Sequence, residues 1–266
     1  MTKRTSLALL RRRIREVCDR GDLGALAEQE DQLRNDPRAG ARELVLRCER
    51  FRAGVLAERT RIDRLFELRR RVEAEGATSV AGVDEVGVGP LAGPVVAAAV
   101  VLPARVDLPG LDDSKKVPRK RREFLAGKIR EQARGWAIGE VAPAEIDRIN
   151  ILQASLEAMR RAVMGLAPGC PPDHVLVDAR RIPGIDMPQT AIVHGDSRDA
   201  SIAAASILAK VYRDALMQDL ENQHPGYGLG QHMGYPTSDH IQALRERGPS
   251  PVHRRSFRPV AVSMRS

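Results

Sequence analysis

Apolar side chains recur at helical spacing through the first part of the chain. They fall three or four positions apart in residues 9–17, and again in residues 44–56 and 59–75. Asn35-Asp36-Pro37 interrupts this pattern, as a turn or a capped helix start would. Arginines and acids fill the positions between. The pattern predicts a small all-helical N-terminal extension over residues 1–76.

The pattern changes at Thr78, where short apolar runs replace the helical spacing. Residues 78–84, 94–102 and 135–141 are strand-sized and mostly apolar, and residues 174–177 and 191–193 form two shorter runs. A connection rich in glycine and proline joins the first two runs. We predict a strand at each of the five.

Two long helices are predicted among these strands. Residues 145–166 place apolar side chains along one stripe, and residues 201–220 are also helical in pattern. Strands followed by alternating helix and strand indicate an α/β domain, with a mixed β-sheet flanked by helices. We expect one such domain over residues 77–266.

Composition favours a globular protein with an anionic partner. Hydrophobic residues make up 42% of the 266 residues and charged residues 29%, which excludes general disorder. The net charge of +8 favours nucleic acid, because phosphates are held largely by Coulomb attraction. Most of this excess lies in residues 1–76, where a solvated helical surface is the favoured interpretation and an accessory nucleic-acid grip the alternative. Aromatic residues, at 3%, are too few for a protein that binds single strands by base stacking.

The remaining composition excludes several other classes. Three widely spaced cysteines, Cys18, Cys48 and Cys170, predict neither a disulfide framework nor a cysteine zinc site. The N-terminus has no secretory h-region, and no apolar run reaches the roughly 18 residues that a membrane span needs. We therefore expect a cytoplasmic protein with no membrane association.

Four acids stand where predicted strands end: Asp84, Glu85, Asp178 and Asp196. Open α/β sheets place their working residues just beyond strand ends, so acids distant in sequence can share one cleft. Clustered carboxylates need a cation, and oxygen-only ligands suit Mg²⁺ or Mn²⁺. Two such ions are the usual arrangement for phosphodiester cleavage. The four acids are therefore candidate catalytic and metal-binding residues.

Simpler interpretations of these acids stay open at this point. A single aspartate at a strand end is more often a helix cap or a turn former, and Asp196 to Asp199 could be only an N-cap. Asp84 and Glu85 point to opposite faces of a regular strand, so both reach one site only if the backbone turns there. The glycines that follow make such a turn plausible. That glycine segment is not a phosphate loop, since it lacks the Lys-Ser/Thr ending and leads into a strand.

Longer motifs go beyond this general chemistry. Residues 81–100, AGVDEVGVGPLAGPVVAAAV, closely resemble the opening motif of bacterial ribonuclease HII, the type 2 ribonuclease H. The resemblance is collinear over about residues 78–260, and the N-terminal helices look like those of some longer bacterial members. The further matching blocks are Asp113–Lys116, Glu145–Asp147 with Asn150-Ile151, Val175–Asp178, Gly195–Ser197, Ser201–Asp214, Gly234–Thr237 and His253–Phe257.

The resemblance implies a ribonuclease H-like fold with a C-terminal helical cap. It implies Mn²⁺- or Mg²⁺-dependent cleavage 5′ of a ribonucleotide, in RNA:DNA hybrids and in duplex DNA with embedded ribonucleotides, leaving 3′-hydroxyl and 5′-phosphate ends. Such an enzyme removes ribonucleotides and primers from DNA. Asp84, Glu85, Asp178 and Asp196 fall on the family's four catalytic carboxylates. A monomer is the default expectation.

The resemblance also implies a set of substrate-binding residues: Gly87, Val88, Gly89, Lys115, Lys116 and Tyr235. Tyr235 falls on the tyrosine that packs against the deoxyribose beside the scissile junction. Three positions depart from the family pattern, since Val88 replaces an arginine and His194 and Met233 each replace a frequent lysine. These departures leave open a catalytically impaired nucleic-acid-binding protein, and a different ribonuclease H-like nuclease is a second alternative.

Overall fold

The computed structural model describes residues 5–166 and 169–264. The chain divides into two compact units, Met1–Arg61 and Ile62–Ser266. The predicted N-terminal helices are confirmed as α1 (Leu7–Arg20), α2 (Leu23–Arg34) and α3 (Ala39–Arg64). Ser6 and Asp22 cap the first two helices, because each side chain accepts a hydrogen bond from a backbone N–H of the first turn. The core of this unit is apolar and includes Ile14, Leu26, Leu33, Ala41 and Cys48.

The division between units falls earlier than the predicted boundary at residue 76. Ile62, Leu65 and Phe66 belong to the core of the sheet-containing unit, and α4 (Glu67–Ala74) packs Val72 against that unit's Val80. The apolar side chains of residues 62–74 recur at the same helical spacing as those before them. The sequence pattern alone therefore groups these residues with the N-terminal extension.

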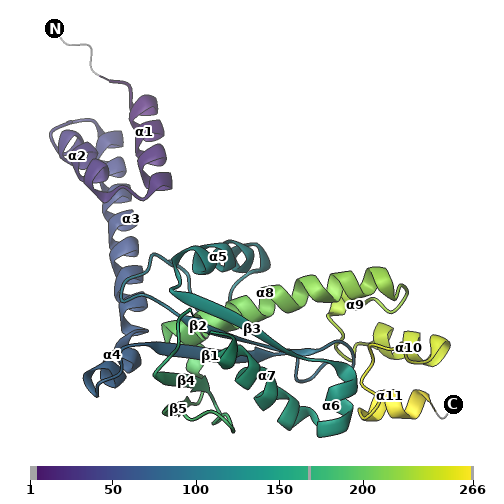
Figure 1. Cartoon of the computed structure of the whole chain (residues 1–266). Helices are drawn as coiled ribbons and strands as arrows, with labels where there is room; N and C mark the ends of the chain where they lie inside the picture. The colour runs from purple at the N-terminus through teal and green to yellow at the C-terminus, as the bar shows by residue number, and fades with distance from the viewer. Residues whose placement is uncertain (1–4, 167–168, 265–266) are drawn as a thin grey trace. The chain divides into compact units, whose positions relative to one another are not determined.

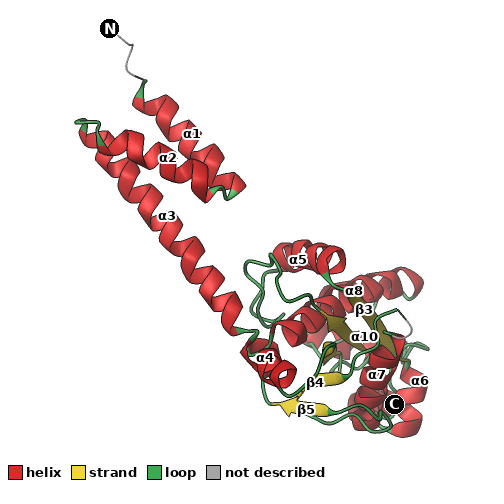
Figure 2. Ribbon diagram, turned by 60° about the vertical axis from the view of Figure 1, so that its left-hand side comes forward, coloured by secondary structure: helices red, strands yellow, loops and turns green. Residues whose placement is uncertain are grey.

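A mixed five-stranded sheet organises the larger unit, as predicted (Figures 1 and 2). The strands lie in the order β3-β2-β1-β4-β5. β1 pairs antiparallel with β2 and parallel with β4, while β2 pairs antiparallel with β3 and β4 pairs parallel with β5. Their bounds are β1 (Val80–Val86), β2 (Val95–Val101), β3 (Gly135–Val141), β4 (His174–Asp178) and β5 (Gln189–Ile192).

Helices cover both faces of the sheet. α8 (Ala200–Gln223) and α5 (Arg119–Gln132) pack on one face, and α6 (Pro143–Ile149) and α7 (Ile151–Gly165) pack on the other. α8 lies unusually close to β1, because a Cβ on Gly82 would lie 2.2 Å from the Ser201 carbonyl carbon. The alanines along α8 permit the same approach, so this helix can place polar groups directly against the strand that carries Asp84.

Two parts of the sequence-based prediction need correction. The single helix expected over residues 145–166 is two helices, divided at Asn150, whose φ of 69° no helix accommodates. The Asn150 side chain caps α7 by accepting a hydrogen bond from the Gln153 N–H at 3.1 Å. The charged helix α5 was not predicted, because it buries only Leu125, Ala126 and Ile129.

Three short helices follow α8 and form the C-terminal region, as the resemblance implied. They are α9 (Leu229–His232), α10 (Ser238–Arg247) and α11 (Arg258–Ser263). Leu244 and Val260 of this region pack on Leu91, which lies in the connection between β1 and β2. Of the helices described, none combines the length and the apolarity that crossing a bilayer requires.

Candidate active site

Strand register brings Asp84 and Asp178 together at one edge of the sheet. The last parallel pair between β1 and β4 is Val83 with Val177, so the next residue of each strand is an aspartate. Neighbouring strands lie about 4.8 Å apart. The two carboxyl groups therefore emerge side by side where the β1–β4 pairing ends.

Asp196 reaches the same place through the turn after β5. Asp178 pairs with Ile192, and the chain then passes His194, which has a left-handed φ of 56°. The Gly195 N–H donates a hydrogen bond of 2.8 Å to Asp178 Oδ1, which fixes the next residue, Asp196, beside Asp178. Asp196 lies in the short 3₁₀ turn η1 (Gly195–Ser197), while the N-cap of α8 is Asp199.

Asp84 and Glu85 point to opposite faces of the sheet. β1 remains regular through both residues, which pair with Ala98 and Ala97, so the backbone turn considered from the sequence is absent there. The Ser206 hydroxyl on α8 donates a hydrogen bond to the Asp84 carboxyl group and lowers its pKa. The Ser155 hydroxyl on α7 does the same for Glu85. The negative charge of Asp178 nevertheless raises the pKa of both carboxyl groups.

The acids repel each other and are partly withdrawn from water. Burial, and then the neighbouring Glu85 carboxylate, raise the pKa of Asp84 well above its ordinary value. Burial, together with Asp113 and Asp178, also raises the pKa of Asp196. A cluster with these shifts holds more negative charge than its surroundings neutralise, which is the electrostatic condition for binding a cation.

The charge of Lys115 interacts with this cluster. Burial tends to lower its pKa, but the carboxylates of Asp113 and of three candidate acids, Asp196, Asp84 and Asp178, raise it overall. Lys116 behaves differently, since its exposed ammonium lies 3.4 Å from Asp112 Oδ1. The structure therefore brings Lys115, but not Lys116, to the acids.

Asp113 is a fifth acid that the sequence analysis did not single out. The Asp113 carboxylate raises the pKa of Asp196. Its Oδ1 also accepts a hydrogen bond of 2.9 Å from the Lys115 backbone N–H, which holds the loop in a tight turn. Its position at the start of the matching block Asp113–Lys116 was the available signal.

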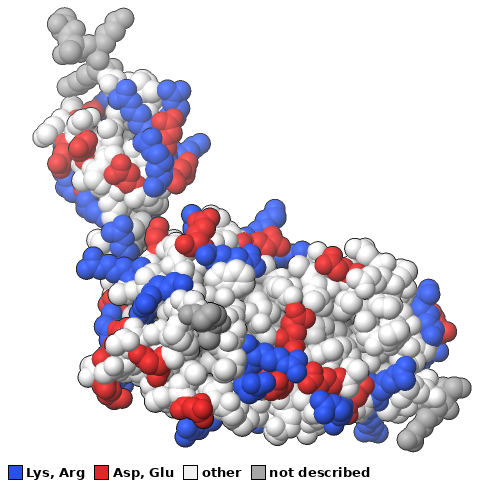
Figure 3. Space-filling view, in the orientation of Figure 1, with Lys and Arg blue, Asp and Glu red and all other residues white. Residues whose placement is uncertain are grey.

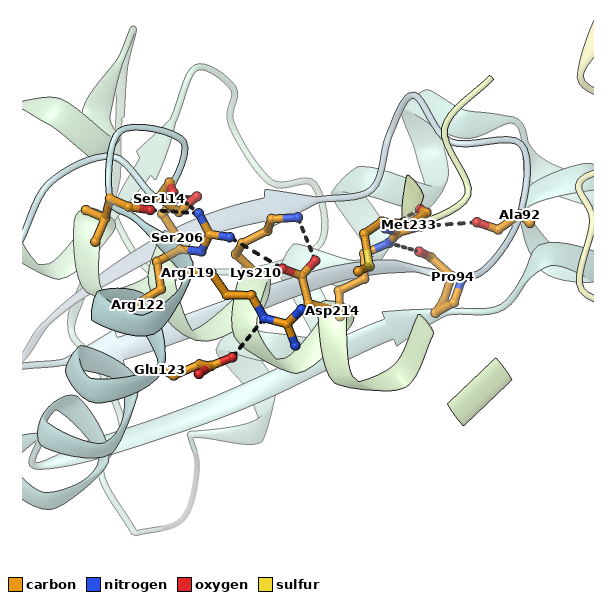
Figure 4. A network of polar contacts seen from close by, with 12 residues as sticks. Ala92, Pro94, Ser114, Arg119, Arg122, Glu123, Ser206, Lys210, Asp214 and Met233 are labelled. Atoms are coloured by element: carbon orange, nitrogen blue, oxygen red, sulfur yellow. Dashed lines mark hydrogen bonds and ion pairs between the residues drawn. The ribbon is translucent and has the colours of Figure 1, made fainter. Parts of the chain in front are cut away.

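The loop that carries Lys115 is fixed to α8 (Figure 4). A buried hydrogen bond of 2.9 Å joins the Ser206 and Ser114 hydroxyls. Arg122 donates to the Ser114 and Val117 carbonyls at 2.9 and 2.7 Å, and lies 3.6 Å from Asp214 on α8. Ser206 thus links the acidic strand end to the lysine loop.

Two buried arginines hold the glycine-rich connection, residues 87–94. Arg254 donates to the Gly87, Val88 and Gly93 carbonyls at 2.6 to 3.1 Å. Arg213 donates to the Pro94 and Ala92 carbonyls at 3.0 and 3.1 Å. Burial lowers the pKa of Arg213 to about 10 and that of Arg254 to about 9.

The arginines turn the loop carbonyls inward. The exposed amides of Val88 and Gly89 donate to no acceptor within residues 5–166 and 169–264. Neither arginine forms an ion pair within these ranges; their hydrogen bonds go to backbone carbonyls, while Asp214 and Asp147 act on Arg213 and Arg254 at longer range. Both arginines lie in matching blocks, yet nothing in their spacing predicts this role.

Tyr235 faces the same loop from the C-terminal region. Its side chain is 43% exposed, and its Cε1 lies 3.6 Å from the position that a Cβ on Gly89 would take. Met233, one of the three departures, packs with Ala92 and Met217 instead of reaching toward the acids. Val88 is exposed and His194 is exposed as well.

The candidate site offers carboxylate oxygens as its ligands. Among the residues that the structure describes, no three histidine, cysteine or acidic side chains are gathered tightly enough to hold a metal ion as they stand. The chemistry of the set still fits a hard divalent cation, because Asp84, Asp178 and Asp196 present carboxylate oxygens.

Comparison with known proteins gives one consistent family. The sequence profile of the family described as ribonuclease HII matches residues 81–260. The chain is 52% identical to ribonuclease HII of Myxococcus xanthus, over 86% of this chain and 78% of that protein. It is 46% identical to ribonuclease HII of Levilactobacillus brevis, over 98% of each chain.

Solved structures agree on the fold. The ribonuclease H2 of Pyrococcus horikoshii superposes with a TM-score of 0.58 at 26% identity, covering 71% of this chain and 98% of that one. A ribonuclease HIII from a structure in complex with Mn²⁺ superposes with a TM-score of 0.56 at 20% identity, covering 71% and 70%. The predicted ribonuclease H-like fold is therefore confirmed.

Proposed function

The chain belongs to the ribonuclease HII family, the type 2 ribonuclease H enzymes, and from that premise we propose that it cuts 5′ of a ribonucleotide in a duplex. Its substrates are RNA:DNA hybrids and duplex DNA with embedded ribonucleotides, and its products carry 3′-hydroxyl and 5′-phosphate ends. The observation that carries the proposal is the convergence of Asp84, Asp178 and Asp196 at one end of β1, β4 and β5.

We propose that the acids hold divalent cations, Mg²⁺ or Mn²⁺, as a two-ion site. Bound there, the ions supply an activated water and stabilise the leaving 3′-oxygen. Asp84 and Asp178 occupy the shared position between the strands, and Glu85 and Asp196 complete the set from either side. The raised pKa values of Asp84 and Asp196 support this proposal, because a cation removes the repulsion among these groups and so favours a tighter arrangement.

The chain's other residues position the duplex. Lys115, whose charge interacts with the acids, holds a phosphate next to the scissile bond. The free amides of Val88 and Gly89 read the ribose 2′-hydroxyl, with Gly87 setting the turn that exposes them. Tyr235, opposite Gly89, packs on the neighbouring deoxyribose, so the pair distinguishes a junction between RNA and DNA. Lys116 contacts a phosphate at the periphery of the site. All these residues belong to one chain, so a monomer suffices.

One observation favours a second candidate, a binding protein with impaired catalysis. Val88 replaces a cationic side chain at the exposed loop, and His194 and Met233 remove two further lysines. All four acids remain, and the amides of the loop do not depend on the side chain at Val88. We therefore favour the active enzyme.

A substrate panel separates these candidates. The full chain is incubated with a duplex bearing one ribonucleotide, a long RNA:DNA hybrid, a branched DNA and an all-DNA duplex, each with Mn²⁺, with Mg²⁺ and with chelator. We expect metal-dependent cuts 5′ of the single ribonucleotide and in the hybrid, and none in the other two. Binding without cleavage supports the impaired protein, and cleavage of branched DNA supports a different nuclease.

Amide variants of the acids test the site itself. We expect Asp84→Asn and Asp178→Asn each to lower the cleavage rate at a single ribonucleotide by at least about 100-fold, because each removes charge from the cation site. Asp112→Asn, in the nearby loop and paired with Lys116, is the matched control and should keep most activity. An Asp84→Asn enzyme that cuts at full rate contradicts the proposed site.

A further inference from the structure

Three histidines of the C-terminal region form a cluster behind Tyr235. The rings of His232 and His240 stack with their centroids 4.4 Å apart, and those of His240 and His253 lie 5.2 Å apart. His240 and His253 are completely or almost completely buried, at 0% and 1% exposure. None of the three reaches the acids, so the proposed chemistry leaves them without a role.

The hydrogen bonds of the cluster determine which ring nitrogens carry a proton. His253 Nδ1 accepts from the Ser250 N–H at 3.1 Å, so a neutral His253 carries its proton on Nε2. That nitrogen lies 3.0 Å from His240 Nε2, which must then accept. His240 therefore carries its proton on Nδ1, which lies 2.9 Å from the Tyr235 carbonyl oxygen and donates to it.

Both rings must be neutral for this chain of hydrogen bonds to exist. A protonated His240 would direct two N–H groups at each other across the 3.0 Å contact, and a protonated His253 would direct an Nδ1–H at the Ser250 N–H. Burial lowers the pKa of His253 to about 4 and also lowers that of His240, so both are neutral at physiological pH.

The chain of hydrogen bonds ends on the backbone of Tyr235. Its carbonyl oxygen accepts from His240 Nδ1 and from the Thr237 N–H at 2.8 Å, and its own N–H donates to the His232 carbonyl at 3.0 Å. The preceding Gly234 carbonyl accepts from the Leu91 N–H at 2.7 Å, which ties the segment to the glycine-rich connection. The exposed ring of Tyr235 thus projects from a backbone whose polar groups are fixed on every side.

We propose that His240 and His253 are positioning residues for Tyr235, holding its ring opposite Gly89 through one directed path of hydrogen bonds from Ser250 to the Tyr235 carbonyl. This inference rests on the proposed function of Tyr235 at the RNA–DNA junction. It assigns the histidines to junction selectivity and not to bond cleavage, because they act only through the tyrosine backbone.

A double-mutant cycle tests the path. His240→Phe keeps a ring but leaves the Tyr235 carbonyl without its imidazole donor, whereas His240→Asn places an amide N–H where Nδ1 stood. For the single-ribonucleotide duplex, we expect His240→Phe to lower kcat/KM about 10-fold and His240→Asn to remain within about 3-fold of wild type. Tyr235→Ala with His240→Phe should be no worse than Tyr235→Ala alone.

Selectivity supplies a readout that a merely structural role would not change. The His240→Phe loss should be smaller for a long RNA:DNA hybrid, where cleavage does not require a junction at Tyr235. Equal losses on both duplexes, additive effects in the double variant, or a His240→Phe enzyme equal to wild type would each overturn the proposal. Thermal unfolding of each variant shows that it is folded at the assay temperature, and His253→Phe, which keeps a ring but removes the donor to His240, replaces His240→Phe if that protein is unfolded.

Nitrogen NMR of the histidine rings tests the path without any substrate. We expect His240 protonated on Nδ1 only and His253 on Nε2 only in the wild-type protein at neutral pH. The reversed assignment, or a protonated ring at neutral pH, overturns the proposal even if the enzyme is active. If the wild type cuts no duplex, the proposed function fails, and the NMR assignment alone decides whether the path exists.

Discussion

At the scale of single residues, Asp84 shows how a candidate catalytic group reduces stability. It is buried beside Glu85 and Asp178, and its pKa is raised in the folded protein. A carboxyl group whose folded pKa lies above its unfolded value stabilises the fold below the unfolded pKa, and this contribution is lost as pH rises through the folded pKa. Without metal, the folded protein therefore bears a growing penalty from Asp84 as pH increases.

Neutralising Asp84 should accordingly stabilise the metal-free protein. In chelator at pH 8 we expect Asp84→Asn to raise the free energy of unfolding by about 1–2 kcal/mol, or roughly 2–8 °C in Tm. The gain should shrink in mildly acidic buffer, because the raised pKa of Asp84 lets the wild-type carboxyl group take up a proton as pH falls. Scanning calorimetry at both pH values measures it. A variant less stable than wild type at pH 8 in chelator would show that Asp84 is not a source of strain.

Divalent metal should act on stability through the same residue. We expect millimolar Mg²⁺ to raise the Tm of the wild type, because a ligand that binds only the folded state stabilises it, and to raise that of Asp84→Asn much less. The same calorimetry with and without the ion provides the comparison. Equal shifts in both proteins would mean that the ion binds elsewhere.

At the scale of elements, the loop between β1 and β2 depends on side chains far away in sequence. Arg254 satisfies three of its carbonyls and Arg213 two more, so the loop keeps its shape without regular secondary structure. Removing either guanidinium group leaves buried carbonyl oxygens without a hydrogen-bond donor. This costs more unfolding free energy than losing an exposed hydrogen bond.

Arg254→Met should therefore destabilise the protein and impair recognition. We expect a loss of about 2–4 kcal/mol in unfolding free energy, measured by urea denaturation, with a weaker preference for single-ribonucleotide duplexes over hybrids. Arg255→Met, one residue away and exposed, is the matched control and should change neither quantity. If Arg254→Met resembles this control, the arginine does not support the loop.

The elements also show where sequence was sufficient. The apolar runs located all five strands, with β3 found at its observed bounds, and the predicted strand ends drew attention to the four acids. The sequence pattern does not predict the helix break at Asn150, because apolar periodicity continues across α6 and α7. The roles of Arg213, Arg254 and the buried histidines arise from contacts across more than a hundred residues or within short loops, which no local pattern encodes.

At the scale of the whole molecule, basic side chains on the face that Figure 3 shows are interspersed with acidic ones. Basic and acidic side chains intermingle over the N-terminal helices (Figure 3). Several arginines there already face acids, as in the pairs of Arg11 with Glu43 and of Arg12 with Glu16. This mixture favours a solvated surface over a nucleic-acid grip.

Exposed arginines of α1 provide the test. Arg13, Arg15 and Arg20 form no ion pair within the described part of the chain. We expect changing all three to glutamine to leave the salt dependence of duplex binding unchanged, measured as log Kd against log salt concentration. A slope reduced by about 0.9 for each arginine removed would instead identify them as phosphate contacts.

The helix α8 imposes a rule on how the protein can change. Asp199, Ser206 and Arg213 follow one another at intervals of seven residues, close to two turns, and serve in turn the helix start, the acidic strand end and the glycine-rich loop. One residue inserted between them would rotate everything downstream by about 100°. The spacing of these three contacts therefore depends on a constant number of residues in α8 between Asp199 and Arg213.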